Sequence, residues 1–347
     1  MKLSSTFIPI LSILYLVHGF LGENSTLEAH DVVIESSGSS LVPPKTYTKP
    51  RLVMYVQTFT TPTKERLSLL PLVEHQTKVT HVILASVHLH EEPGQIRLND
   101  DPFDSPVWDT TWEEVKVLQN HGIKVMAMLG GAAAGTYKRL NGTDTEFYSY
   151  YHPLRDLIGK YKLDGLDIDI EETVDVSVPF RLMNALRRDF GPGFIITMAP
   201  LASALSDKLG QNLSGFSYFD LDAFATVPGS DEKLISWFNG MFYGGFARGP
   251  PFFQSVVDAG WDPSRVVMGV LDCSEDGQPN GFVHIETLQQ TIRNLRELYP
   301  GFGGVAGWEY HDAGMSDGDV YEPWAWVKKI GQALFEAAPG KTGNEEL

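Results

Sequence analysis

The stretch LDGLDIDIEE, residues 163–172, places an acidic residue at every second position of an otherwise apolar run. β-Strands usually exclude Asp and Glu, but side chains two residues apart in a strand point to the same face. In a strand, Asp167, Asp169 and Glu171 would share one face, and the Leu and Ile residues between them the other. The pattern predicts either a charged sheet edge or a row of carboxyls that carries out chemistry.

Apolar runs bounded by Gly or Pro recur along the chain on both sides of this stretch. Strands are expected at residues 51–57, 79–89, 124–131, 163–171, 194–200, 237–245, 266–271 and 303–310. Helices are expected at residues 110–122, 153–162, 179–191, 285–301 and 323–338. Near-continuous hydrophobic strands that alternate with helices indicate an α/β fold with a parallel sheet covered on both faces. Eight such units in about 290 residues predict a (β/α)8 TIM barrel. The alternative, an open doubly wound sheet, would call for a G-x-G-x-x-G turn after the first strand, and the sequence has none there.

In such a barrel the acidic stretch is the fourth strand, and its acids point into the interior. Same-face positions rise by about 6.6 Å, so Glu171 lies near the carboxyl-terminal mouth, Asp169 below it and Asp167 deeper still. Three carboxyls in a low-dielectric interior cannot all ionise cheaply, so they should titrate as a coupled system. We expect this arrangement to keep Glu171 protonated near neutral pH, as a general acid requires.

Two other interpretations of the acidic row are less favoured. One or two acids in a strand often form a solvated face, but three in strict alternation, followed by a loop, favour a functional site. Carboxylates also suit Mg²⁺ or Ca²⁺. However, consecutive inward positions on one strand are poorly arranged to surround an ion without ligands from other strands. We therefore expect neither a metal nor a cofactor.

The segment DGLDIDIE, residues 164–171, resembles the D-G-x-D-x-D-x-E signature of glycoside hydrolase family 18. This family contains chitinases, endo-β-N-acetylglucosaminidases and catalytically dead sugar-binding relatives. Three other segments fit the resemblance: LGG at 129–131, with Met128 where Ser is common, GMFYGGF at 240–246 and GVAGWEY at 304–310. The resemblance implies hydrolysis of a glycosidic bond on a TIM barrel.

Within the family, residues from about Arg51 to Ala337 resemble in particular the secreted fungal endo-β-N-acetylglucosaminidases that trim N-glycans. The matching segments lie in loops and strand ends as well as in the core: VTHVILASVHL (79–89), RLNDDPFD (97–104), KVMAMLGGAAAGTY (124–137), FGPGFIITMAPLASAL (190–205), NLSGFSY (212–218) and GWEYHDA (307–313). This resemblance implies N-glycosylated proteins or free N-glycans as the substrate.

The resemblance also implies a role for each acid. Enzymes of the family retain the anomeric configuration without an enzyme nucleophile, because the substrate's own 2-acetamido oxygen attacks the anomeric carbon. Glu171 would protonate the leaving glycosidic oxygen and then deprotonate the incoming water. Asp169 would accept a hydrogen bond from the acetamido N–H, and Asp167 would share a proton with Asp169 and set its orientation. Asp164 is expected to be structural, and Gly165 to allow a close backbone approach.

Three further residues are candidate substrate contacts. Tyr243 would donate its O–H to the acetamido oxygen, and Asn239, on the same strand face, would assist either the acetamido group or the water. Trp308 would form an apolar floor under the reacting sugar ring. The alternative for all three is an ordinary residue of the barrel interior. Tyr55 and Glu309 could also face the pocket.

The composition excludes several classes of protein. The chain has 347 residues, 43% hydrophobic and 20% charged, so it can bury a large core and is neither disordered nor a multi-span membrane protein. The net charge of −17 would repel phosphate backbones and anionic lipids, so neither a nucleic acid nor a membrane is expected as a partner. The one cysteine, Cys273, excludes an intrachain disulfide and is interpreted as a packed thiol.

The amino terminus predicts secretion. Residues 1–22 contain an apolar run that is short for a bilayer span and is followed by small residues, which is typical of a cleaved signal peptide. The alternative is a retained signal anchor. Residues 23–50 are expected to be a linker or pro-segment, residues 51–338 the catalytic barrel, and residues 339–347 a flexible tail. Three N-x-S/T sequons agree with secretion: Asn24, Asn141 and Asn212.

The sequence therefore predicts a secreted, monomeric, retaining endo-β-N-acetylglucosaminidase that cleaves the GlcNAc-β1,4-GlcNAc core of N-linked glycans. Small residues in the loop at 131–143 leave space beside the acids, which favours a branched glycan over a deep chitin tunnel. An endochitinase with the same chemistry is the nearest alternative. A non-catalytic sugar-binding protein is the alternative of another class, and the intact row of Asp167, Asp169 and Glu171 argues against it.

Overall fold

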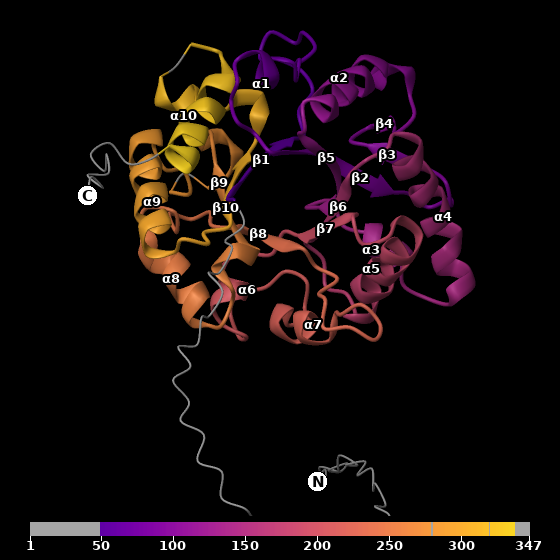
Figure 1. Ribbon diagram of the computed structural model, residues 1–347. Coiled ribbons are helices and arrows are strands. Elements are labelled where there is room, and N and C mark those ends of the chain that lie inside the picture. Colours follow the sequence, from indigo (N-terminus) through magenta and orange to yellow (C-terminus); the bar gives the residue numbers. More distant parts are fainter. Residues whose placement is uncertain (1–48, 279, 319, 337–347) are drawn as a thin grey trace, which may run out of the picture. The chain divides into compact units, whose positions relative to one another are not determined.

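The computed structural model describes residues 49–278, 280–318 and 320–336 (Figure 1). The expected signal peptide, the expected linker up to residue 48, the expected tail and the sequon at Asn24 lie outside the described residues. Their extents stay predictions.

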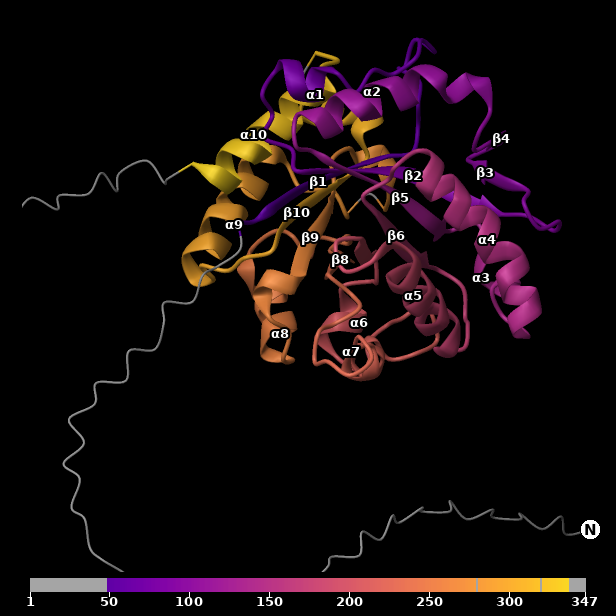
Figure 2. The ribbon, with the colours of Figure 1, turned by 45° about the vertical axis from the view of Figure 1, so that its right-hand side comes forward.

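Parallel strands lie at the centre of the fold, with helices around them (Figures 1 and 2). The barrel strands are β1 (Arg51–Val56), β2 (His81–Leu89), β5 (Lys124–Gly131), β6 (Gly165–Ile170), β7 (Ile195–Met198), β8 (Trp237–Met241), β9 (Val266–Leu271) and β10 (Gly304–Trp308). β1 pairs with both β2 and β10, which closes the sheet into a cylinder. A short hairpin, β3 (Ile96–Leu98) and β4 (Asp101–Pro102), extends β2 beyond the barrel. The predicted TIM barrel is confirmed, and all eight expected strands are present.

Helices cover the outside of the barrel. In the described residues the α-helices are α1 (Pro71–Glu74), α2 (Asp109–Asn120), α3 (Thr136–Arg139), α4 (Asp144–Lys160), α5 (Ser177–Phe190), α6 (Ser203–Ser206), α7 (Tyr218–Phe224), α8 (Pro250–Asp258), α9 (Ile285–Leu298) and α10 (Pro323–Phe335). Short 3₁₀ turns occupy Pro106–Trp108, Pro263–Arg265, Ser274–Asp276, Tyr310–Asp312 and Met315–Asp317. The five expected helices correspond to α2, α4, α5, α9 and α10.

Two predicted boundaries, the start of α4 and the end of β8, differ most from the structure, each for a local reason. α4 begins at Asp144 and not at Pro153, because Thr143 and Glu146 form a capping box in which each side chain accepts the other's backbone N–H. β8 ends at Met241 and not at residue 245. Gly244 and Gly245 follow with φ angles of 75° and 88°, and this left-handed backbone cannot continue a strand.

The alternation of β6 divides its side chains between two apolar layers. Leu166, Ile168 and Ile170 belong to the large cluster between the strands and the helices. A smaller cluster of inward-facing residues fills the barrel itself: Val53, Tyr55, Ile83, Ala85, Met126, Met128, Trp237, Val267 and Ala306. Asp167 and Asp169 point toward this interior, so the acidic row lies inside the barrel.

The start of β6 is fixed by Asp164 and Gly165. The Asp164 carboxylate accepts hydrogen bonds from the Lys124 ammonium at 2.7 Å and the Val125 backbone N–H at 2.9 Å, which is a structural contact, as expected. Gly165 lies beside Ile195 of β7. A Cβ at Gly165 would be 2.4 Å from the Ile195 carbonyl oxygen, so only glycine permits this strand spacing.

Two expectations concern the surface: the absence of a membrane partner and the N-x-S/T sequons. Among the described residues, none of the helices combines the length and the hydropathy that crossing a bilayer requires. The sequon residue Asn141 is exposed, whereas Asn212 is partly buried and donates its side-chain N–H to the Phe216 carbonyl.

Candidate active site

A pocket of about 540 Å³ opens at the carboxyl ends of the barrel strands. Six residues singled out from the sequence contribute to its wall: Tyr55, Asp169, Glu171, Asn239, Tyr243 and Trp308. Small and apolar residues such as Met128, Ala132 and Gly244 complete the lining. Asp167 lies beneath it, with none of its surface exposed. The structure thus brings the predicted site residues together from β6, β8 and β10.

Asp167 is held by three neighbouring side chains. The Tyr55 hydroxyl donates to Oδ2 at 2.8 Å, while the Thr197 hydroxyl and the Asn239 amide donate to Oδ1 at 2.5 and 3.2 Å. Burial raises the pKa of Asp167, and the three hydrogen bonds act in the opposite direction. The side chain is fixed in one orientation by groups on three other strands.

Asp169 lies one step nearer the mouth, with 3% of its surface exposed. Its carboxyl is hydrogen-bonded to that of Glu171. Burial, followed by the charges of Glu171 and Asp167, raises the pKa of Asp169 well above its usual range. Both neighbouring carboxyls thus act on Asp169, and the proton that the resemblance implies between Asp167 and Asp169 stays a prediction.

The remaining oxygen of Asp169 is available to a ligand. Its Oδ1 atom is buried and has no hydrogen-bond partner among the described residues. A buried carboxylate oxygen without a partner is costly, and an amide N–H of a bound molecule would relieve that cost.

Glu171 follows directly after the last residue of β6 and is only partly buried. Burial raises the pKa of Glu171 above its usual value, while the hydrogen bond with Asp169 lowers it. The carboxyl is therefore both reachable from the pocket and able to hold a proton at a higher pH than a solvated glutamate.

Aromatic side chains complete the pocket. Trp308, at the end of β10, lies with its ring centroid 5.4 Å from that of Tyr55. Tyr243 lies two residues past the end of β8. Burial of its hydroxyl, and then the charge of Asp169, raise the pKa of Tyr243 well above its usual range. The Tyr243 hydroxyl is thus a neutral donor at any ordinary pH.

Asn239 connects the pocket to the deeper network. Its amide oxygen accepts a hydrogen bond from the Trp237 indole at 2.8 Å, and its amide nitrogen donates to Asp167. Asn239 is therefore part of the buried hydrogen-bond network around Asp167, and it also lines the pocket.

The end of β5 requires a glycine, and the loop after β5 is held by an acid beside the row. Gly130 has a φ of 99°, and a Cβ there would lie 2.2 Å from the Asp169 carbonyl oxygen. Glu172 accepts the backbone N–H groups of Gly135 and Tyr137 at 2.9 and 3.0 Å. The loop is thereby anchored to the end of β6, next to Glu171.

A second hollow of about 650 Å³ adjoins the pocket. The loop after β5 separates the two, because Ala132 lines the pocket while Ala133 and Ala134 line this groove. The groove has polar and apolar lining residues, which include Phe59, His88, His90, Asn99, Asp101 and Arg139. We call it the side groove.

The sequence analysis did not single out Thr197 or Asp276, and it named Glu309 only as a residue that could face the pocket. Thr197 is a single polar residue in the apolar run of β7, a signal that could have marked it as inward-facing. The Glu309 carboxylate accepts hydrogen bonds from the Gln57 and Thr58 N–H groups at 2.7 and 2.8 Å, so it fastens β10 to the end of β1. Asp276 lines the pocket from the turn after β9.

Comparison with known proteins agrees with this geometry. A sequence profile described as "Glycosyl hydrolases family 18" matches residues 51–244. Among solved structures, the chain is similar to the chitinase ChiC from Aspergillus fumigatus, with 42% identity and a TM-score of 0.71 over 82% of this chain and 99% of that one. It is similar as well to a fungal endo-beta-N-acetylglucosaminidase from glycosyl hydrolase family 18, with 37% identity and a TM-score of 0.73 over 82% and 98% of the two chains.

The curated relatives are more distant. The chain is 26% identical over 220 residues to Chitinase 2 of Rhizopus oligosporus, which is 59% of this chain and 37% of that protein. It is 23% identical over 246 residues to Chitinase 1 of Rhizopus niveus, where the match covers 66% and 45%. The match thus spans less than half the length of either Rhizopus protein.

Proposed function

We propose, since the chain belongs to glycosyl hydrolase family 18, that it is a retaining endo-β-N-acetylglucosaminidase acting on the GlcNAc-β1,4-GlcNAc core of N-linked glycans. The observation that carries the proposal is the row of Asp167, Asp169 and Glu171. It rises from the barrel interior to the pocket that Tyr243 and Trp308 line. We further propose that the protein is secreted and acts as a monomer.

The first step breaks the glycosidic bond. Glu171 donates its proton to the glycosidic oxygen as the bond to the anomeric carbon breaks, and the substrate's 2-acetamido oxygen bonds to that carbon. The Asp169 carboxylate accepts the acetamido N–H and stabilises the positive charge that develops on the group. Its unpartnered Oδ1 atom supports this role. The products are an oxazoline-type intermediate and the released sugar or glycoprotein.

The second step releases the glycan. The Glu171 carboxylate takes a proton from a water molecule while the water oxygen attacks the anomeric carbon and the bond to the acetamido oxygen breaks. Each of the two displacements inverts the configuration of the anomeric carbon, so the original configuration is restored. The neutral Tyr243 hydroxyl donates to the acetamido oxygen, and the Trp308 ring packs under the sugar and excludes water.

The choice of N-glycans has two supports. The first is the 37% identity to a fungal endo-beta-N-acetylglucosaminidase across nearly its whole length. The second is the side groove, because its amide, carboxylate, imidazole and guanidinium groups suit the hydroxyls of a mannose branch. A linear chitin chain would not need a second hollow beside the pocket.

Endochitinase activity is the second candidate function. It is favoured by the 42% identity to the chitinase ChiC, which spans 99% of that chain. The chemistry at Glu171 and Asp169 would be the same for both substrates, so only the groups on either side of the scissile bond distinguish them.

The test is the intact mass of a folded high-mannose glycoprotein after incubation with the wild-type protein and with Glu171→Gln. We expect the wild type to leave one N-acetylglucosamine on each Asn and the variant to leave the glycan intact. Cleavage of chitin oligosaccharides without any change in the glycoprotein would assign the protein as a chitinase. No reaction with either substrate would favour the non-catalytic sugar-binding alternative.

A variant of the side groove sharpens the comparison of substrates. His90 lies in the side groove and away from the acidic row, so His90→Ala should lower kcat/KM for the glycoprotein by about 3- to 10-fold, as expected for the loss of one or two hydrogen bonds. It should leave the cleavage of chitotetraose unchanged. Equal losses on both substrates would show that the groove does not distinguish them.

A further inference from the structure

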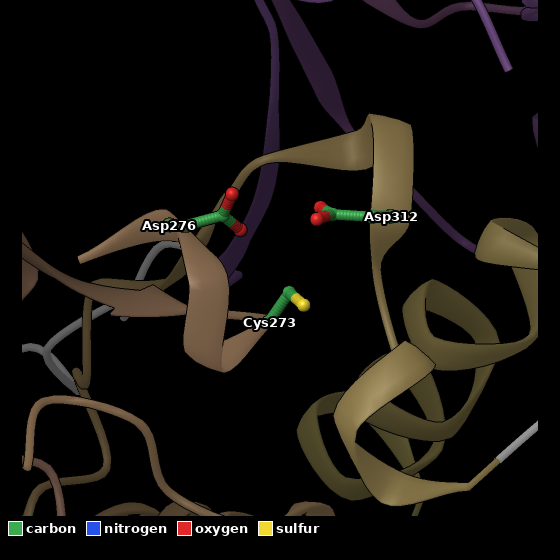
Figure 3. A group of neighbouring side chains, drawn as sticks. All are labelled: Cys273, Asp276 and Asp312. Carbon is green, nitrogen blue, oxygen red and sulfur yellow. The ribbon is translucent and has the colours of Figure 1, made fainter. Parts of the chain in front are cut away.

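A compact group of potential metal ligands lies behind one wall of the pocket. The Cys273 thiol and the carboxylates of Asp276 and Asp312 each place one ligand atom within 4.8 Å of the other two. Cys273 and Asp276 belong to the turn after β9, and Asp312 ends the 3₁₀ turn after β10. Figure 3 shows the two carboxylates pointing toward each other, with the thiol between and below them. We call these three residues the thiol–carboxylate cluster.

A fourth acid independently indicates a missing ligand. Asp272 has no exposed surface, and neither of its carboxylate oxygens has a hydrogen-bond partner in the described part of the chain. Burial, followed by the charges of Asp276 and Asp312, raises the pKa of Asp272 well above its usual range. The Asp272 carboxyl lies between β9 and β10, since its Oδ2 atom would be 2.9 Å from a Cβ at Gly307, and Asp272 directly precedes Cys273 in the chain. Within the cluster, the buried Oδ1 atom of Asp312 also lacks a partner among the described residues.

The partners of the cluster do not offset its acidity. Asp276 accepts one backbone N–H, from Glu309 at 3.2 Å, and Cys273 lies 3.2 Å from the Ser316 hydroxyl. The groups that act most strongly on Asp272 are themselves acids. Burying a carboxyl with neither a hydrogen bond nor a positive charge is unfavourable by several kcal/mol. A cation bound between these side chains would remove that penalty.

We propose that Asp276, Asp312 and Cys273, with Asp272 beside them, bind one divalent cation with the ligand chemistry of zinc. Zinc accepts thiolate and carboxylate ligands together, whereas calcium and magnesium take oxygen ligands. Binding releases the protons that the thiol and the carboxyls hold in the absence of the ion. The proposal does not depend on the substrate of the enzyme.

The position of the cluster indicates a structural role for the cation. Asp276 lines the catalytic pocket, and the backbone carbonyl of Asp272 accepts the Gly314 N–H at 3.0 Å. A cation would join the turn after β9 to the turns after β10, and both lie next to Trp308. It would hold that wall of the pocket in place without contacting the reacting bond.

A metal site is not expected from the sequence. The sequence gives no ligand spacing typical of a metal site, because Asp312 follows Asp276 by 36 positions and the two meet only where β9 and β10 end side by side. The expectation of no metal concerns the acidic row of Asp167, Asp169 and Glu171, and the thiol–carboxylate cluster lies outside that row.

The test is direct measurement of cation binding by the full chain after dialysis against a chelator. Isothermal titration with ZnCl₂ should give one site per chain, and zinc should raise the thermal unfolding midpoint by several degrees. Asp312→Asn should weaken zinc binding at least about tenfold and remove the thermal shift. Glu275→Gln is the matched control, since Glu275 is an exposed acid of the same turn; it should bind zinc as the wild type does.

A second comparison keeps the test valid if a variant is unstable. Without added metal, Asp312→Asn should be at least as stable as the wild type, because it removes one of several mutually repelling acids. With zinc, the order should reverse, and Cys273→Ser should lose most of the zinc affinity too. Saturable binding of calcium but not zinc would overturn the zinc assignment. Absence of binding, or equal binding by wild type and Asp312→Asn, would overturn the site and leave Asp276 and Asp312 as a pair that shares a proton.

Discussion

The Tyr55 hydroxyl donates a hydrogen bond of 2.8 Å to Oδ2 of Asp167, a residue 112 positions later in the chain. Tyr55 is on β1 and Asp167 on β6, so the bond crosses the interior of the barrel. Thr197 and Asn239 donate to the other oxygen from β7 and β8. Four strands therefore converge on one buried carboxylate, and its orientation is set before any substrate binds.

Tyr55→Phe should lower kcat while leaving the fold intact. Loss of the hydroxyl removes a hydrogen bond that lowers the pKa of Asp167. The Asp167 side chain, the deepest of the acidic row, is then held less firmly. We expect about a tenfold loss in kcat, equivalent to one buried hydrogen bond to a charged group, with little change in KM. Tyr150→Phe removes an exposed hydroxyl bonded to the Glu91 carbonyl and is the matched control. Equal kcat values for all three proteins would mean that Asp167 needs no such anchor.

Glu171→Gln should abolish most of the activity without loss of stability. Glutamine keeps the shape of the side chain but cannot transfer a proton, so kcat should fall by about 10²- to 10⁴-fold. The deficit should be smaller for an aryl glycoside with a good leaving group, since its departure needs little protonation. Glu113→Gln, at an exposed position of α2, controls for the change in charge. A full deficit on both substrates would argue against the acid role.

The sequence predicted the strands well because each is a continuous apolar run. Buried parallel strands need apolar residues on both faces, and that requirement leaves a local pattern. The sequence does not predict α8, because its Pro250-Pro251 start resembles a turn, although proline suits the first turn of a helix. The predicted start of α4 is too late because Pro153 resembles a helix start, whereas Phe147 and Tyr151 continue the same buried face before it.

The site was predictable where its residues are close in sequence. Asp167, Asp169 and Glu171 show their common face through a period of two. Tyr55 and Thr197 have no such signal, because the direction of one side chain depends on register across the barrel. The thiol–carboxylate cluster was not predictable at all, since its members meet only after two neighbouring strands have paired.

Asp169→Asn should stabilise the fold in a pH-dependent way. Because the folded-state pKa of Asp169 is raised, the folded protein holds this proton over a pH range in which the unfolded chain has lost it. Below the unfolded pKa of about 3.9 both states are protonated and the penalty is absent; as pH rises above that value the wild type loses stability. The variant should gain about 1–3 kcal/mol at neutral pH and nothing near pH 3.

Thermal or urea unfolding from pH 3 to 8 measures this difference. Asp220→Asn is the opposite control, because Asp220 is exposed and the hydrogen bond from Lys208 lowers its pKa. That variant should be slightly less stable than the wild type at neutral pH. A stability gain for Asp169→Asn that is the same at every pH would rule out an electrostatic origin.

Gly165→Ala should damage both the fold and the active site, although the change adds one methyl group. The new Cβ would lie 2.4 Å from the Ile195 carbonyl oxygen and 2.7 Å from its Cβ, so β6 and β7 must move apart. Overpacking of this kind costs about 1–3 kcal/mol, and the shift of β6 moves the acidic row against Tyr55 and Thr197. We expect a lower urea midpoint together with a reduced kcat.

Gly159→Ala makes the same chemical change where there is space. Gly159 is in α4, nothing lies within 4 Å of its added Cβ, and alanine is the better helix former, so stability should rise by up to about 1 kcal/mol. Activity should not change. If Gly165→Ala were as stable and as active as Gly159→Ala, β6 and β7 could move apart at no cost. Strand spacing would then not be the reason for a glycine at position 165.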